Sequence, residues 1–227
     1  TKPETYRLIM DHDVNGIVIL GRCDKATLKL LKQHFHYVVY TGLNGIDANY
    51  DQILCDGYGA AFCALEYLIE LGHKHIGYVG ETISENRYQA YRAFIEQYQL
   101  PFDSSYVATV PFSSNGGYKG AQKLLEQQPK LTAIFCGNDI TAIGALRSIK
   151  DRKAKIPKDI SVISIDDIDM AQYLSPMLTT VHIPVEEMGK MAAKTLIDRI
   201  NGGHTLPMRI QLPYYLAKRE SCGKPQT

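Results

Sequence analysis

The chain alternates short apolar runs with longer amphipathic runs along most of its length, and this alternation constrains the fold more than any single motif. Runs rich in Val, Ile and Tyr predict strands at residues 16–21, 37–41, 75–79, 106–110, 133–136 and 161–165. Runs with helical spacing predict helices at residues 25–33, 57–71, 86–98, 115–127 and 140–151. Strands separated by helices of about 10 to 15 residues form βαβ units. The sequence therefore predicts an α/β fold with doubly wound parallel sheets.

The two ends of the chain carry weaker signals. Residues 6–13 have the pattern of the end of a helix. Pro184 opens a further predicted helix, which Gly202 and Gly203 end. Beyond it we expect an extended segment at residues 209–217 and frayed residues at 218–227.

Length and composition exclude several classes of protein. With 227 residues the chain can form one large α/β unit or two small lobes. The net charge is +1, and Lys and Arg are scattered, so no basic stripe marks a nucleic-acid-binding surface. No apolar stretch approaches the roughly 18 residues of a membrane span, and the first residues do not form a signal peptide. The five cysteines are odd in number and lie mostly in apolar runs, which favours buried thiols over disulfides. We therefore expect a soluble, cytoplasmic chain.

The common catalytic motifs are absent from the sequence. There is no Gly-x-Ser-x-Gly nucleophile turn, no phosphate-binding loop ending in Gly-Lys-Ser/Thr, and no Gly-x-Gly-x-x-Gly after a strand. His73 and His75 could lie on one face of a strand and bind a metal, but no Cys or carboxylate joins them at ligand spacing. An ordinary turn between helix and strand explains them equally simply. We expect neither a metal nor a cofactor.

Residues 133–181 hold the most informative polar groups. Two apolar runs in this stretch each end in a polar pair, Asn138–Asp139 and Asp166–Asp167. Ligands of open parallel sheets bind outside the carboxyl ends of the strands, where these pairs would fall. The aspartates, with Asp169, could hold a magnesium ion or accept bonds from ligand hydroxyls, and the missing phosphate-binding loop favours the hydroxyls. Asp139 stands just before a predicted helix and is expected to be its N-cap, which makes Asn138 the better pocket residue.

Several of these segments together resemble the effector-binding domain of lactose-repressor-family transcriptional regulators. The resemblance lies in residues 71–80, Arg87, and residues 133–146, 156–167, 175–181 and 184–189, and it extends over roughly residues 15–217. It implies a periplasmic-binding-protein-like (type I) fold, with two α/β lobes around a cleft and three chain crossings between them. The expected amino-terminal lobe is residues 1–53 plus 182–206. The expected carboxy-terminal lobe is residues 54–181 plus 207–227.

The resemblance also implies a set of ligand-binding residues. The family arginine that contacts the effector corresponds to Arg87, whose planar fork of donors suits vicinal hydroxyls or a carboxylate. Asn138 corresponds to a strand-end asparagine that can donate to and accept from a hydroxyl. Asp166 would accept from two sugar hydroxyls, and Asp167 would brace the turn. Two further candidates have rival explanations: Phe112 could stack on the effector or pack in the core, and Thr41, on the opposite lobe, could contact the ligand or cap a loop.

Two departures from the family pattern affect the expected function. Ala90 replaces the glycine of the usual Arg-x-x-Gly, a small-for-small change, and the family's helix-turn-helix head, hinge and first sheet elements have no counterpart in these residues. Operator DNA would therefore be contacted only through a head domain absent from this chain.

The resemblance implies a non-enzymatic module that senses a small effector, usually a sugar or sugar phosphate. It would form a homodimer through the exposed side of residues 141–150 and through residues 170–175. One alternative is the solute-binding receptor of a sugar transporter. A second is an enzyme that uses the aspartates with magnesium.

Overall fold

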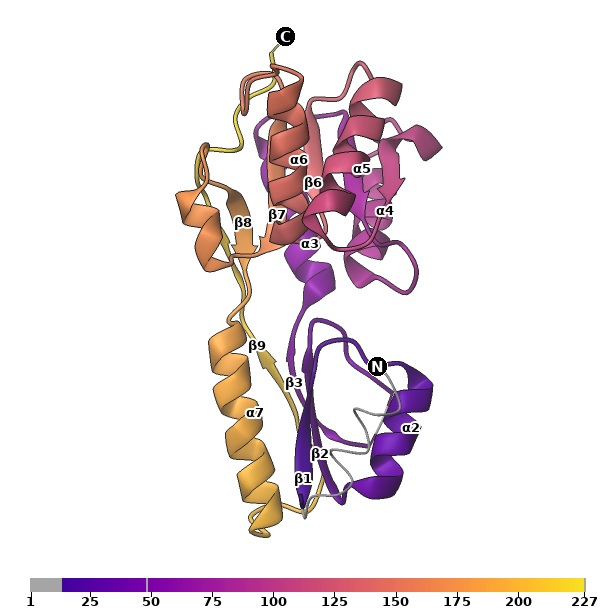
Figure 1. Cartoon of the computed structure of the whole chain (residues 1–227), viewed down its shortest axis with the longest axis vertical. Coiled ribbons are helices and arrows are strands. Elements are labelled where there is room, and N and C mark those ends of the chain that lie inside the picture. Colours follow the sequence, from indigo (N-terminus) through magenta and orange to yellow (C-terminus); the bar gives the residue numbers. More distant parts are fainter. Residues whose placement is uncertain (1–13, 48, 227) are drawn as a thin grey trace. The chain divides into compact units, whose positions relative to one another are not determined.

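The computed structural model describes residues 14–47 and 49–226, and the chain divides into two compact units (Figure 1). Unit 1 comprises Thr1–Asp56 and Pro184–Pro213, and unit 2 comprises Gly57–Ile183 and Tyr214–Thr227. The expected boundary after Leu206 differs most from the observed one, which lies after Pro213. The reason is that residues 209–212 pair with a strand of the unit 1 sheet. The helix predicted at residues 6–13 lies outside the described residues.

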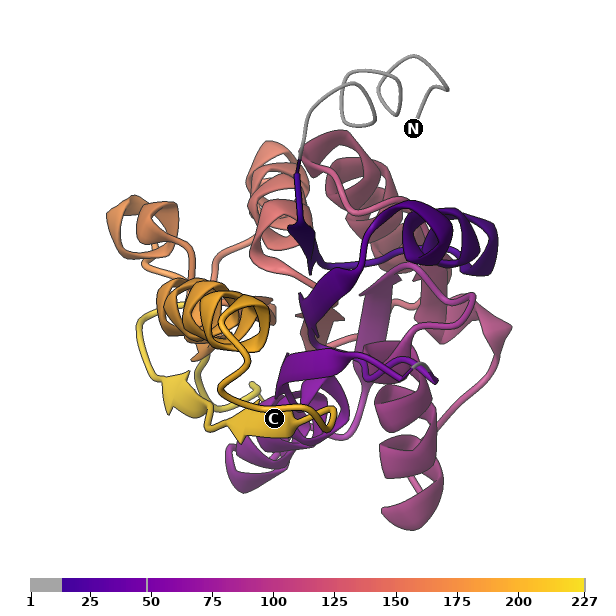
Figure 2. The same cartoon turned by 90° about the horizontal axis from the view of Figure 1, so that it is seen from below.

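Unit 1 is a four-stranded parallel sheet with a helix on each face (Figures 1 and 2). The strand order is β1-β2-β3-β9. Its elements are β1 (Gly16–Leu20), α2 (Lys25–His34), β2 (Tyr37–Gly42), β3 (Asp51–Cys55), α7 (Val185–Ile200) and β9 (Arg209–Leu212). Asp24 caps α2 by accepting a bond of 2.9 Å from the Thr27 amide, as the sequence indicates. Leu31 of α2 packs against Val38 and Leu54 on one face of the sheet.

Unit 2 is a six-stranded sheet of order β10-β8-β7-β6-β4-β5, parallel except for β10. Its strands are β4 (Ile76–Gly80), β5 (Val107–Thr109), β6 (Ala133–Cys136), β7 (Ser161–Asp166), β8 (Thr179–His182) and β10 (Tyr215–Ala217). Its helices are α3 (Gly57–Glu70), α4 (Asn86–Gln97), α5 (Ser114–Gln127), α6 (Asp139–Asp151) and the short η1 (Ser104–Tyr106) and η2 (Asp169–Tyr173). The segment predicted as extended, residues 209–217, thus forms two strands, one in each unit.

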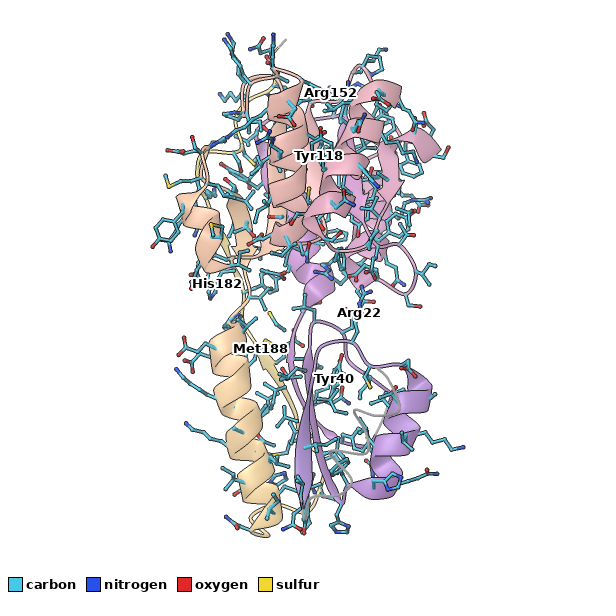
Figure 3. All side chains as sticks on the ribbon, viewed as in Figure 1. Arg22, Tyr40, Tyr118, Arg152, His182 and Met188 are labelled. Atoms are coloured by element: carbon cyan, nitrogen blue, oxygen red, sulfur yellow. The ribbon has the colours of Figure 1, made fainter. Side chains whose placement is uncertain are left out.

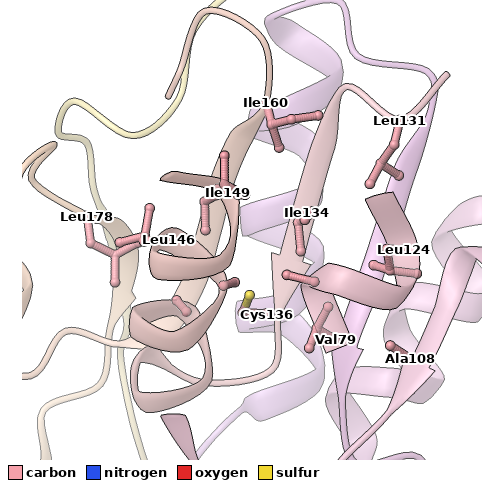
Figure 4. Close-up of a cluster of buried hydrophobic side chains, with 14 of the residues drawn as sticks. Val79, Ala108, Leu124, Leu131, Ile134, Cys136, Leu146, Ile149, Ile160 and Leu178 are labelled. Carbon is pink, nitrogen blue, oxygen red and sulfur yellow. The ribbon is translucent and has the colours of Figure 1, made fainter. Parts of the chain in front are cut away.

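Helices cover both faces of the unit 2 sheet, as the uninterrupted apolar runs of its strands indicate. On one face, Val79, Ile134 and Cys136 pack with α5 and α6 in a cluster of buried side chains (Figure 4). On the other face, Tyr78 contacts Tyr91 of α4, with ring centroids 5.4 Å apart. The predicted doubly wound arrangement is confirmed for this unit.

Helices α5 and α6 approach each other closely because glycines form the contact. A Cβ atom at Gly117 would lie 1.9 Å from the carbonyl oxygen of Thr141, and one at Gly144 would lie 1.8 Å from that of Ser114. No larger residue fits at either position without moving a helix backbone.

The prediction that residues 218–227 are frayed is wrong for the residues that the structure describes. Ser221 is fully buried, its carbonyl accepts from the Val162 amide at 2.8 Å, and its hydroxyl accepts from the Thr179 amide at 2.8 Å. The Gly223 amide donates to the hydroxyl of Ser161 at 3.1 Å. The tail is therefore fixed to unit 2 by polar groups that have no hydrophobic pattern in the sequence.

Candidate functional site

The carboxyl ends of three neighbouring strands meet at one edge of unit 2. Strands β7, β6 and β4 are adjacent and parallel, so Asp166, Gly137 and Gly80 lie at or just beyond the same edge of the sheet. Arg87 and Phe112 join this edge from α4 and from the segment before α5. This is where the sequence placed the ligand site, and we call this group of residues the strand-end site.

Arg87 is held firmly in the strand-end site. It is only 7% exposed, and its Nε and Nη2 groups donate to the two carboxylate oxygens of Glu85 at 2.7 and 3.1 Å. Its Nη1 group donates to the carbonyl oxygen of Gly137 at 2.7 Å. Sequence analysis missed Glu85, which is the N-cap of α4 and accepts from the Arg87 amide. A bidentate carboxylate of this kind fixes the plane of the guanidinium.

The ring of Phe112 packs against the guanidinium of Arg87. The guanidinium carbon of Arg87 lies 4.5 Å from the centre of the Phe112 ring, a cation–π contact. The ring has room because two strand ends carry glycine: a Cβ at Gly80 or Gly137 would lie 2.9 or 2.6 Å from the ring edge. Phe112 is half-buried, so it packs on Arg87 and also keeps part of its surface accessible.

Asp166 is the acidic member of the strand-end site. Its Oδ1 atom lies 4.0 Å from Nη1 of Arg87, and its side chain is 28% exposed. Burial raises the pKa of Asp166 to about 7; Arg87 opposes this rise and the nearby Asp139 adds to it. Its φ of +125° is one that L-residues rarely adopt, which places the carboxylate away from the regular path of β7. A carboxyl that exchanges a proton near neutral pH can accept or donate a ligand hydrogen bond.

The helix cap predicted for Asp139 is provided by Asn138 in the structure. Asn138 is the N-cap of α6, because its side-chain oxygen accepts from the Thr141 amide at 2.9 Å. Asp139 is fully buried and accepts from the Ser164 and Thr180 hydroxyls, at 2.5 and 2.6 Å, and from the Ile168 amide at 2.8 Å. The prediction that Asp139 caps the helix is therefore wrong. The cap uses one lone pair of the Asn138 oxygen, so Asn138 can offer a ligand its amide N–H groups most readily.

Asp167 has the contacts of a bracing residue. Its carboxylate lies 2.7 Å from Nη2 of Arg219 and 2.9 Å from Nδ1 of His182, which Figure 3 labels at the end of β8. His182 in turn stacks on Tyr215, with ring centroids 4.6 Å apart. The strands β8 and β10 are thereby tied to the turn that carries Asp166.

The two metal hypotheses find no support in the described part of the chain, where no three His, Cys, Asp or Glu side chains form a group that could hold an ion. Asp166 and Asp167 face different arginines. His73 is buried between the Thr132 hydroxyl and the Gly223 carbonyl, at 2.9 and 2.8 Å. His75 instead contacts the Tyr106 hydroxyl at 2.7 Å.

Thr41 is the one candidate that belongs to the other unit. It lies in β2 of unit 1 and is buried there, whereas Arg87, Phe112, Asn138 and Asp166 all belong to unit 2. A hollow of about 750 Å³ also lies in unit 1, and none of the five predicted residues lines it.

Two doubly wound units joined by three chain crossings, with polar groups at strand ends, have the construction of a periplasmic-binding-protein-like domain. A family model described as a periplasmic binding protein-like domain matches residues 65–222, and the chain belongs to this family. The predicted fold class is confirmed, and so is the resemblance to effector-binding domains of LacI-family regulators.

The curated relatives are transcriptional repressors. The chain is 31% identical over 221 residues to the HTH-type transcriptional repressor MelR of Bacillus subtilis (strain 168), a match that covers 93% of the chain and 64% of the relative. It is 34% identical over 175 residues to the repressor PurR of Yersinia pestis (strain Pestoides F), over 75% of the chain and 51% of the relative. The chain thus spans between half and two thirds of these proteins.

Solved structures of similar fold include regulators with sugars bound. The chain matches the transcriptional regulator CelR–cellobiose complex with a TM-score of 0.86 and 27% identity, over 96% of this chain and 69% of that one. It matches a LacI-family regulator from Enterococcus faecium with bound ribose with a TM-score of 0.87 and 27% identity, over 98% and 85%. Among the described residues, no helix has the length and apolar character needed to cross a membrane.

Proposed function

We propose that this chain is the effector-sensing and dimerisation domain of a DNA-binding transcriptional repressor, and that its effector is a small sugar-like molecule. The observation that carries the proposal is the strand-end site, where Arg87 is fixed by Glu85, packed on Phe112 and 4.0 Å from Asp166. Repressor relatives and sugar-bound structural neighbours support the same conclusion.

The chemistry of the strand-end site suits hydroxyl groups. A guanidinium has five N–H donors, and Arg87 uses three of its side-chain donors on Glu85 and Gly137, which leaves one each on Nη1 and Nη2 among the bonds of the described residues. Asp166 supplies acceptors and Asn138 supplies amide donors. The accessible part of the Phe112 ring would contact the C–H face of a sugar.

The proposed response to the ligand is a change in the populations of two conformations. A ligand alters such an equilibrium only by binding one state more tightly than the other. We propose that contacts from unit 1, with Thr41 as the candidate, provide this difference. In a parent protein the change would alter how a dimer presents its DNA-binding heads to operator DNA.

We also propose that unit 2 carries the dimer surface. Ile140, at the start of α6, and Met170 and Tyr173 of η2 are 38%, 53% and 76% exposed, which is unusual for large apolar side chains in one region. Met170→Ser combined with Tyr173→Ser should convert a dimer to a monomer in sedimentation experiments. An unchanged mass would locate the dimer surface elsewhere.

The two alternative functions are less well supported. The relatives are transcriptional repressors, which favours the regulator over a transporter receptor. We infer that the domain is not an enzyme, because its relatives are transcriptional repressors and Asp167 is bound by Arg219. A turnover screen with magnesium and phosphorylated sugars tests this inference.

Calorimetry on a small set of variants tests the proposed function. A thermal-shift panel of mono- and disaccharides, free and phosphorylated, first identifies a sugar that stabilises the chain. Asp166→Ala should then abolish calorimetric binding of that sugar while leaving the circular dichroism spectrum unchanged. Glu96→Ala, an exposed acid of α4, is the matched control and should bind normally. Wild-type affinity in Asp166→Ala would refute the assigned site.

A further inference from the structure

One carboxylate in unit 1 joins the far ends of the three segments that lead to unit 2. Strand β3 runs to the first crossing, α7 starts after the second, and β9 runs to the third. Asp51, the first residue of β3, is 1% exposed and accepts from Nε and Nη2 of Arg199, near the end of α7, at 2.9 and 2.8 Å. It also accepts from the Met208 amide, just before β9, at 2.7 Å.

His204 completes this cluster from the segment that connects α7 to β9. Its Nδ1 atom contacts a carboxylate oxygen of Asp198, and its Nε2 atom lies 3.2 Å from Oδ2 of Asp51. An ionised carboxylate only accepts hydrogen bonds, and a neutral imidazole carries only one N–H. Both contacts can be hydrogen bonds at the same time only if His204 is protonated on both nitrogens.

The backbone around His204 is shaped to admit the Asp198 carboxylate. A Cβ atom on residue 203 would lie 2.1 Å from Oδ1 of Asp198, so the glycine leaves the space that this carboxylate occupies. The Gly203 amide also donates to the Asp198 carbonyl at 2.9 Å. The contact between His204 and Asp198 is therefore built into the local chain path.

The charged groups around His204 come from each neighbouring element. Helix α7 provides Asp198 and Arg199, and β3 provides Asp51. His34, the last residue of α2, and His36, just before β2, line the hollow of about 750 Å³ together with His204, and Tyr37 and Tyr50 line it too.

The pKa shifts in this cluster agree with the geometry. The bond to Asp198 raises the pKa of His204, burial lowers it, and the Asp51 bond raises it, with a net rise. Burial acts to raise the pKa of Asp51, but the bonds from Arg199, Met208 and His204 outweigh it and lower the value.

We propose that His204 is a proton-controlled latch. As an imidazolium it holds residues 201–208, one wall of the hollow, against α7 and β3; as a neutral imidazole it keeps only one of its two contacts, and the segment opens more often. Because the folded-state pKa of His204 is raised, its contribution to stability is complete below the ordinary value of about 6.5 and is lost as the pH rises through the folded value. The lowered pKa of Asp51 means that its contribution is lost only in acid, below the ordinary value of 3.8. This inference concerns the ligand-free chain and does not depend on the proposed function.

Amide exchange and histidine titration, measured by NMR on the whole chain, test the latch. In the wild type, the His204 ring should titrate above pH 6.5, and protection of the Met208 amide and residues 201–208, corrected for intrinsic exchange, should fall several-fold between pH 6 and pH 9. Asp198→Asn is the discriminating variant. The asparagine amide can donate to Nδ1 of a neutral His204, whose Nε2–H still donates to Asp51. In this variant the protection of residues 201–208 should therefore not change between pH 6 and pH 9.

His204→Ala should have low protection in this segment at every pH, with the amides of β2 still protected as evidence of folding. The proposal is overturned if wild-type protection is equal at pH 6 and pH 9, or if Asp198→Asn loses protection as the wild type does. If His204→Ala does not fold, the comparison of the wild type with Asp198→Asn still tests the proposal.

Discussion

Asp166→Asn should stabilise the protein at alkaline pH and should weaken ligand binding. The pKa of Asp166 is raised from 3.8 to about 7, so folding disfavours the ionised form. A group with a raised folded-state pKa gives stability that is present below its unfolded pKa and is lost as the pH rises through the folded value. Asparagine cannot ionise, and it tolerates the positive φ of this position better than most residues.

The size of the effect follows from the two pKa values. At full ionisation, a shift of about three pKa units corresponds to about 4 kcal/mol, and between pH 5 and pH 8 the linkage relation gives a change of about 2 to 3 kcal/mol. The stability advantage of Asp166→Asn over the wild type should therefore grow by that amount over this range.

Urea unfolding at pH 5 and pH 8 measures this difference. Asp159→Asn is the control: Asp159 is exposed and accepts from the Lys155 amide at 2.7 Å, a bond that an asparagine oxygen can keep. A difference between Asp166→Asn and the wild type that stays constant with pH would refute the reasoning, because the carboxyl would then not titrate in this range.

Four other substitutions test separate parts of the structure. Glu85→Gln removes the charge that fixes Arg87, so calorimetry should show roughly tenfold weaker sugar binding with the fold retained; unchanged affinity would count against this role. Gly117→Ala should cost about 2 to 3 kcal/mol in urea unfolding because its Cβ would meet the Thr141 carbonyl, whereas Gly189→Ala, on an open part of α7, should stabilise by about 0.5 to 1 kcal/mol. Ser221→Ala should lower the free energy of unfolding by about 1 to 2 kcal/mol, because its hydroxyl joins Thr179 and Val162; no loss would mean that the tail adds little.

The periodic parts of this fold could be predicted from the sequence, and the parts that depend on polar partners could not. Most strands and helices follow from hydrophobic spacing, and the doubly wound sheet follows from their alternation, whereas β3 and β8 were not predicted as strands. The buried position of Asp139 escaped prediction because its partners are Ser164 and Thr180, which lie 25 and 41 residues away in the chain. Ser221 had no local signal for the same reason.

The strand-end site itself was partly predictable. Asp166 was expected from its place at the end of a strand and Arg87 from the family resemblance, and the structure brings them to 4.0 Å. Glu85 determines how Arg87 is held, but an acid two residues before an arginine has many possible uses. The glycines that admit Phe112 are recognisable only once the strands are paired.

Chemical-shift mapping by NMR, with cellobiose, ribose and phosphorylated sugars added in turn, tests directly whether Arg87, Asn138 and Asp166 bind a hydroxyl-rich ligand at one edge of unit 2. A sugar that binds there should shift the Arg87 Nε–H, the Asn138 side-chain amide and the Asp166 backbone amide more than other signals. Sugar-induced shifts confined to the hollow of unit 1, or no shifts with any of these sugars, would contradict this assignment.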